Sequence, residues 1–158
     1  MAKYTRLTKE QFEELHREFI NFLASQTITS KEWTKLKKDN PEAAEQELDI
    51  FSDLIWEGVL NKTEYLEKID PQHLNLFKLG DSEMVLLVIK ILDDSIDVTT
   101  RSGFDWLKMN LTTDKVEMFK ASKKYSEDKN LDKFKLIEQG VIISEGVFYN
   151  MIHKIINT

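Results

Sequence analysis

Residues 71–92, PQHLNLFKLGDSEMVLLVIKIL, decide the fold class. From His73 to Leu79 the pattern shifts toward alternating apolar and polar residues, and Gly80-Asp81-Ser82 then leads into the apolar run 83–92. Two such runs joined by a short turn that contains glycine predict a β-hairpin. The apolar middle of the second run is typical of a strand buried on both faces. The chain therefore contains an antiparallel sheet.

The sequence before Pro71 predicts helices. Thr8-Lys9-Glu10-Gln11 and Thr29-Ser30-Lys31-Glu32 each place Gln or Glu three residues after a threonine, which is the pattern of a capping box. These boxes begin predicted helices over 9–25 and 30–38. Asn40-Pro41 begins a third over 41–68, because proline is favoured at the first helical position.

The sequence after the hairpin predicts short elements. In order they are a turn (93–95), a strand (96–100), two helices (114–124 and 130–139), a hairpin (141–149) and a last helical turn or two (151–156). Residues 101–110 carry no decisive pattern. We expect an α+β fold in a single domain, 1–158: a helical N-terminal half, with two short capped helices and one long helix, packed with a small antiparallel sheet and C-terminal helices.

The composition excludes several classes of site. Of the 158 residues none is cysteine, which excludes disulfides, cysteine-ligated zinc, iron–sulfur clusters and thiol nucleophiles. The first residues lack the apolar core of a signal peptide. The longest apolar run, Met84–Ile89, is far shorter than the ~20 residues that cross a bilayer. We therefore predict a cytoplasmic protein with no membrane contact.

Charge is distributed unevenly around a formal net charge of −6. Residues 40–70 hold nine acidic side chains against two lysines, whereas residues 115–135 hold seven lysines against four acidic side chains. Because affinity for nucleic acid comes mainly from basic groups, the overall acidity argues against a general nucleic-acid binder. Such an asymmetry either steers protein partners or pairs two parts of the same chain, and the sequence alone does not choose between them.

No motif for catalysis or cofactor binding is present. The five glycines are too widely spaced for a dinucleotide or phosphate-binding loop, and neither G-x-S-x-G nor H-E-x-x-H occurs. His16 follows Glu13 by three residues, but the second Glu-x-x-His of a di-iron site is missing. We therefore predict no cofactor and no catalytic residue, and favour a protein that is not an enzyme.

Asp93, Asp94 and Asp97 form a small carboxylate cluster beside a predicted strand. Aspartate is common in turns because its side chain bonds to the local backbone, and this interpretation is favoured. The alternative is a metal site, since hard cations such as Mg²⁺ take carboxylate ligands. It would make the protein a metal-dependent hydrolase or transferase.

The third predicted helix carries an acidic stripe. Its members recur every four residues: Glu45, Asp49, Asp53 and Glu57. A helical wheel places the core side opposite this stripe, with these residues: Ala44, Leu48, Phe51, Ile55, Val59 and Leu66, widened by Ile50 and Leu54. Trp56 and Leu60 fall outside that core side, next to the stripe. They predict either a docking surface for a protein partner or a second contact inside the chain.

A lysine-rich stretch provides a third candidate. Lys115, Lys120, Lys123, Lys124 and Lys129 are interleaved with Phe119 and Tyr125, a composition that could contact RNA. The acidic residues among them weaken this interpretation.

Three segments resemble one known family. They are Lys3-Tyr4-Thr5-Arg6-Leu7-Thr8, Glu18-Phe19-Ile20-Asn21-Phe22-Leu23 and Leu48-Asp49-Ile50-Phe51-Ser52-Asp53-Leu54-Ile55, and the closing residues 140–149 are also similar. They resemble an uncharacterised family of small bacterial proteins, a domain of unknown function. The resemblance implies a stand-alone cytoplasmic bacterial protein and no known site residues. Together with the charge asymmetry, it leads us to expect a non-enzymatic protein-interaction module or an accessory subunit of a larger assembly.

Overall fold

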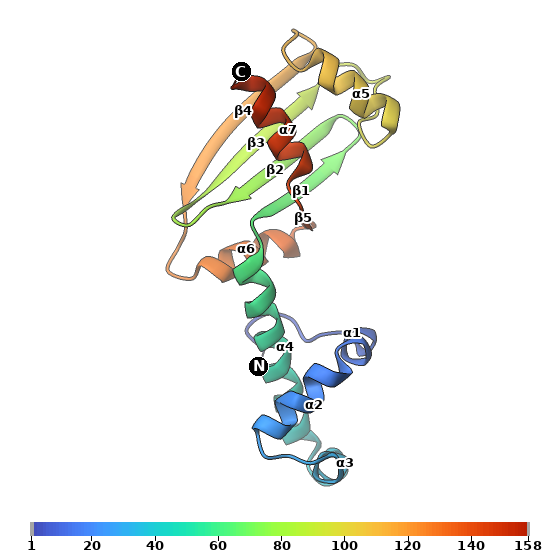
Figure 1. Ribbon diagram of the computed structural model, residues 1–158, viewed down its shortest axis with the longest axis vertical. Coiled ribbons are helices and arrows are strands. Elements are labelled where there is room, and N and C mark those ends of the chain that lie inside the picture. Colours follow the sequence, from blue (N-terminus) through green and yellow to red (C-terminus); the bar gives the residue numbers. More distant parts are fainter. Residues whose placement is uncertain (1, 158) are drawn as a thin grey trace. The chain divides into compact units, whose positions relative to one another are not determined.

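The computed structural model describes residues 2–157 and confirms the α+β class (Figure 1). Within these residues the chain forms seven α-helices and a five-stranded antiparallel sheet. The sequence predicts one domain; the structure divides after Asn61 into two compact units, which we call the helical unit and the sheet unit. Each is described separately below.

The helical unit contains four helices: α1 (Lys9–Glu14), α2 (His16–Ser25), α3 (Ser30–Asp39) and α4 (Pro41–Lys62). The predicted caps are confirmed: Thr8 and Gln11 form a capping box, and Thr29 and Asn40 accept main-chain N–H bonds from the first turns of α3 and α4. The prediction of one helix over 9–25 is wrong, because the chain leaves helical geometry at Leu15 (φ −100°, ψ 24°). No glycine or proline marks this break.

An aromatic core holds the helical unit together. Phe51 of α4 is almost completely buried, and its ring centroid lies 5.1 Å from that of Phe19 and 5.4 Å from that of Phe22, both in α2. The apolar residues that flank the two caps belong to the same cluster: Leu7 and Phe12 at the first cap, and Ile28 and Trp33 at the second. Aromatic pairs at these separations add stability beyond their buried area.

The sheet unit has the strand order β4-β3-β2-β1-β5. Its elements are β1 (Tyr65–Asp70), β2 (His73–Leu79), β3 (Glu83–Ile91), α5 (Arg101–Asn110), β4 (Val116–Lys124), α6 (Lys129–Glu138), β5 (Ile142–Ser144) and α7 (Val147–Ile156). The predicted hairpin is confirmed as β2 and β3, which pair from His73 opposite Lys90 to Leu79 opposite Met84. The helix predicted over 130–139 is confirmed as α6, followed by Gly140 at φ +93°.

Four predictions in this unit are wrong. Residues 65–70 form β1 rather than the end of the long helix, and residues 116–124 form β4 rather than a helix. Residues 96–100 are a loop rather than a strand, and the predicted hairpin over 141–149 is β5 followed by α7. Both segments that were predicted as helices form strands because they pair with other strands of the sheet. β1 pairs with β2 and β5, and β4 pairs with β3 along its whole length. Tertiary pairing overrides local propensity here.

Helices cover both faces of the sheet. Leu74, Leu76 and Ile89 are buried on one face with residues of α5 and α7, and Figure 1 shows α7 crossing that face. Because side chains alternate along a strand, Leu66 and Phe77 point to the other face, where they pack with Leu136 and Ile137 of α6. We call these two surfaces the α7 face and the α6 face. Within residues 2–157, no helix combines the length and apolar character needed to cross a membrane.

Candidate functional site

The helical unit contains an open groove of about 660 Å³ between the N-terminal segment and helices α1 to α3, with Leu48 of α4 at its base. Seven of its lining side chains are apolar: Leu7, Phe12, Phe19, Ile20, Leu23, Trp33 and Leu48. The volume lies within the usual range of ligand-binding clefts, roughly 300–1,000 Å³. A mostly apolar concave surface on three short helices is thus the best-formed candidate site.

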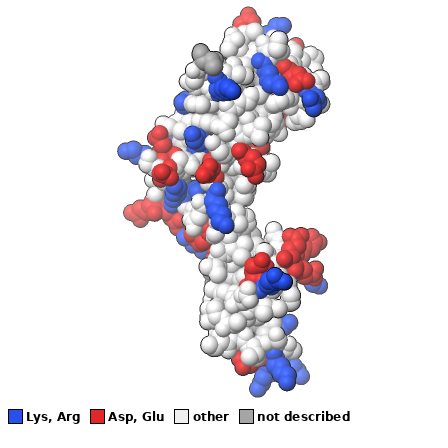
Figure 2. Space-filling model, viewed as in Figure 1, with Lys and Arg blue, Asp and Glu red and all other residues white. Residues whose placement is uncertain are grey.

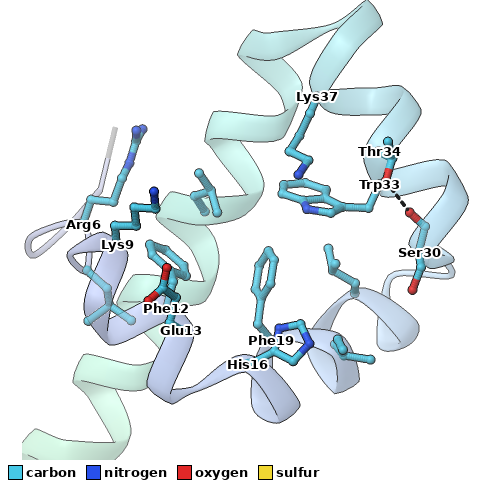
Figure 3. A pocket seen from close by; sticks show the side chains of 14 residues that line it. Arg6, Lys9, Phe12, Glu13, His16, Phe19, Ser30, Trp33, Thr34 and Lys37 are labelled. Atoms are coloured by element: carbon cyan, nitrogen blue, oxygen red, sulfur yellow. Dashed lines mark hydrogen bonds between the residues drawn. The ribbon is translucent and has the colours of Figure 1, made fainter.

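Three aromatic rings form the apolar floor of the groove. Phe12 comes from α1, Phe19 from α2 and Trp33 from α3, and Figure 3 shows the rings turned toward the same space. Phe19 meets Phe12 edge to face at 5.6 Å and Trp33 edge to face at 5.3 Å. Trp33 and Phe12 are only half-buried, so a ligand could cover more of both rings. The position of Trp33 follows from the Thr29 cap, which places it in the first turn of α3.

Charged side chains surround this apolar floor. Lys9 of α1 and Lys37 of α3 are exposed, and the Lys37 ammonium lies 5.7 Å from the centre of the Trp33 ring. Arg6 also lines the groove, but Asp49 already accepts a 2.7 Å bond from its Nε. Glu13 is the single acidic side chain in the lining. Figure 2 shows basic side chains gathered at the end of the view where Figure 1 places α3.

A second hollow of about 360 Å³ adjoins the groove. It shares Ile20, Leu23 and Ser30 with the groove and continues to the turn between α2 and α3. Thr27 in that turn has φ +59°, a conformation that residues other than glycine seldom adopt. The two hollows therefore adjoin one another at residues of α2 and α3.

The acidic stripe of α4 has a partner within the chain. Asp53 accepts the main-chain N–H groups of Lys3 (2.8 Å) and Tyr4 (3.0 Å), and Glu57 accepts the Tyr4 hydroxyl and the Lys3 ammonium. Arg6 guanidinium beside Asp49 holds the pKa of that carboxyl below its usual value. The residues predicted to bind a foreign protein thus hold the segment Lys3–Leu7 on α4; we call this segment the N-terminal strap.

The contact between the N-terminal strap and α4 buries the side chain of Tyr4. Tyr4 is buried, and the loss of hydration, together with the hydrogen bond to Glu57, raises the pKa of its hydroxyl to about 12. The hydroxyl therefore stays protonated at neutral pH and keeps donating to the carboxylate.

Of the two alternatives for Trp56 and Leu60, Leu60 follows the contact inside the chain, because it is fully buried. Trp56 is half-buried, packs on the aromatic core and donates from Nε1 to the Thr5 carbonyl oxygen at 3.1 Å. The helical-wheel prediction of the core side was wrong because it assumed a single buried side along the whole of α4. Instead, the exposed apolar residues include three that it placed on the core side: Ile50, Leu54 and Val59.

The three aspartates proposed as a metal site take part in turns. Asp93 accepts from the N–H and hydroxyl of Ser95, and Asp97 accepts from the same groups of Thr99. The bonds from Ser95 lower the pKa of the Asp93 carboxyl. Among residues 2–157, no group of three or more histidine or carboxylate side chains is arranged to hold a metal ion, these aspartates included.

Side-chain alternation along β4 distributes the lysine-rich stretch over both faces of the sheet. Lys120 and Lys124 lie on the α7 face of β4, and Phe119 and Lys123 lie on the α6 face. Tyr125 already has a partner within the chain, because its hydroxyl donates to the Gly80 carbonyl oxygen at 2.7 Å. The structure therefore brings together only part of the surface proposed for RNA.

One buried lysine lies outside these candidates. Lys133 of α6 is 3% exposed, and its ammonium donates to the Thr63 carbonyl oxygen at 3.1 Å. Burial lowers the pKa of this lysine, as expected for a charge removed from water. Its bond to the residue that follows α4 indicates a structural role at the start of the sheet unit.

Sequence reasoning missed the groove. The available signals were the aromatic residues placed at the two helix starts, Phe12 and Trp33, and Ile20, which is 41% exposed. These residues did not identify the groove, because a groove depends on how three helices pack, and spacing within one helix does not report that.

A family model described as "Family of unknown function (DUF6495)" matches residues 1–157, so the chain belongs to that family. No curated protein and no solved structure matches the chain. The assignment confirms the resemblance to a family of unknown function. It adds no activity, ligand or partner.

Proposed function

We propose that this member of the DUF6495 family is a protein-interaction module whose helical unit binds an amphipathic segment of a partner. The carrying observation is the groove: an apolar floor formed by Phe12, Phe19 and Trp33, with Lys9 and Lys37 on its rim. Amphipathic segments bind such grooves through a few apolar anchors. Buried aromatic anchors supply most of the binding energy of interfaces of this kind.

The charges indicate which polar residues the partner carries. Lys9 and Lys37 form no ion pair within residues 2–157, whereas Arg6 is paired with Asp49 and Glu45. Acidic residues beside the apolar anchors would therefore pair with Lys9 and Lys37. Each exposed pair contributes about 0.2–1 kcal/mol, so the charges select the partner while the aromatic floor supplies affinity.

Two synthetic helical peptides test this proposal. Both are 16 residues long with the same leucine and tryptophan anchors, and their polar faces carry glutamate in one peptide and lysine in the other. We expect the glutamate peptide to bind more tightly, by about 2- to 30-fold for two exposed ion pairs. Fluorescence anisotropy of the labelled peptides measures both affinities.

Matched variants locate the binding. Ile20→Glu places a carboxylate in the groove and should weaken the glutamate peptide at least tenfold, whereas Ile50→Glu, at an exposed position of α4 outside the groove, should leave its affinity unchanged. Lys37→Glu should weaken binding and Lys35→Glu should not, since only Lys37 lines the groove. Equal affinity for the two peptides, or equal effects of the paired variants, would contradict the proposal.

A further inference from the structure

β4 lies at one edge of the sheet. One side of the strand pairs with β3, and within residues 2–157 no strand pairs with the other side. From Phe119 to Lys124 every residue of β4 is exposed. We call these six residues the open edge; they present both faces and one hydrogen-bonding side to solvent.

The register shows which main-chain groups point outward. Leu92 N–H donates to the Lys115 carbonyl oxygen at 2.9 Å, and the same antiparallel register continues through the pairs of β3 and β4. Bonded and non-bonded positions alternate in such a pair. The N–H and C=O groups of Lys120, Ser122 and Lys124 therefore point away from β3, and the open edge offers three successive positions for pairing.

The side chains of the open edge differ between the two faces of the sheet. Lys120 and Lys124 lie on the α7 face. Phe119, which is 58% exposed, and Ala121 lie on the α6 face with Lys123. Within residues 2–157, none of the three lysines forms an ion pair. The α7 side is thus basic, and the α6 side is largely apolar.

We propose that the open edge binds an extended segment of a partner protein, in which acidic and apolar residues alternate, by strand addition. Main-chain bonds to Lys120, Ser122 and Lys124 provide the affinity of such pairing, and the alternating side chains provide its specificity. The acidic residues of the segment face Lys120 and Lys124. Its apolar residues contact Phe119 and Ala121.

A second copy of this chain does not fit the open edge. Two such edges paired antiparallel bring the lysines of one strand close to those of the other, and like charges on neighbouring strands are destabilising. Lysines on edge strands also commonly discourage edge-to-edge association. If the lysines served only to prevent association of the edge, an acidic strand would not bind there. The proposal predicts that it does bind, so a binding experiment distinguishes the two roles of the lysines.

The test uses a fluorescein-labelled octapeptide in which valine and glutamate alternate. We expect it to bind the full chain and to bind Ser122→Pro at least tenfold more weakly, because proline removes an outward N–H while leaving the bonds between β3 and β4 in place. Ser122→Ala keeps that N–H and should bind like the natural chain. The peptide N-methylated at alternate residues keeps its charge but loses its donors, and should also bind at least tenfold more weakly to the natural chain.

Three further probes complete the test. The valine–lysine octapeptide should not bind, and Ile20→Glu in the groove should leave the valine–glutamate peptide unaffected, which separates this proposal from the function proposed above. Circular dichroism checks that Ser122→Pro is folded; if it is not, the N-methylated peptide decides. No binding of the valine–glutamate peptide, equal binding of its N-methylated form, or tighter binding of an oligouridylate that is indifferent to Ser122→Pro overturns the proposal.

Discussion

The hydroxyl of Ser52, fully buried in the middle of α4, accepts a hydrogen bond from the main-chain N–H of Leu7 at 3.0 Å. It also donates to the Leu48 carbonyl oxygen at 2.7 Å. One hydroxyl therefore joins the N-terminal strap to the helix at the point where the strap delivers Leu7 to the aromatic core.

Ser52→Ala should lower the free energy of unfolding by about 1–3 kcal/mol, because the buried Leu7 N–H loses its acceptor. Urea denaturation followed by tryptophan fluorescence measures the loss, since Trp33 and Trp56 both belong to the helical unit. Ser122→Ala, on the exposed edge of β4, is the matched control and should stay within about 0.5 kcal/mol of the natural chain. Similar losses in the two variants would show that the strap bond is not important.

The contact between Arg6 and Asp49 should make stability depend on pH. Because the pKa of Asp49 is lower in the folded chain than in the unfolded chain, its contribution is present above the usual aspartate pKa of about 3.9 and is lost as the pH falls below it. The pair is partly exposed, so the contribution is about 0.5–1 kcal/mol.

Asp49→Asn should therefore be less stable than the natural chain at pH 6, and this deficit should shrink as the pH falls from 4 towards 2. Urea midpoints measured over this pH range give the difference. A deficit that stays constant from pH 6 down to pH 2 would assign the effect to packing instead of charge.

Two glycine substitutions should change stability in opposite directions. A Cβ at Gly103 in α5 would lie 1.7 Å from the Asp97 carbonyl oxygen, so Gly103→Ala forces the backbone of the preceding loop to move. We expect a loss of about 1–3 kcal/mol or more. Gly58→Ala in α4 meets nothing within 4 Å and should raise stability by about 0.5–1 kcal/mol, because glycine is a poor helix former. Thermal melts of both variants test the contrast.

The sequence predicted those parts of the fold that are determined by neighbouring residues. Thr8, Thr29 and Asn40 act as caps through bonds to residues three positions away, so a short window contains all the necessary information. The same holds for the hairpin of β2 and β3, whose three-residue turn is explicit in the sequence. These elements were predicted nearly to the residue.

The edge strands could not be predicted in this way. From Phe119 to Lys124, β4 is exposed on both faces, so its sequence carries no alternation of apolar and polar residues and looks like a solvated helix. β1 follows a long helix with no proline or glycine between them, and its strand state depends on pairing with β2 and β5.

The candidate site shows the same division between local and distant information. The acidic stripe was recognised as a surface with a partner, but that partner is a segment about fifty residues away in the same chain, and spacing within α4 cannot identify it. The groove depends on the packing of three helices, which no single helix reveals.

The N-terminal strap also constrains the order in which the helical unit folds during synthesis. Its bonds join residues 3–7 to residues 43–54 positions later in the chain, so the strap leaves the ribosome long before α4 exists to receive it. Until α4 has been translated, the carboxylates that pair with Lys3 and Arg6 do not yet exist, and Leu7 lacks its contact with Phe51. The helical unit therefore reaches its final form only when translation has passed α4.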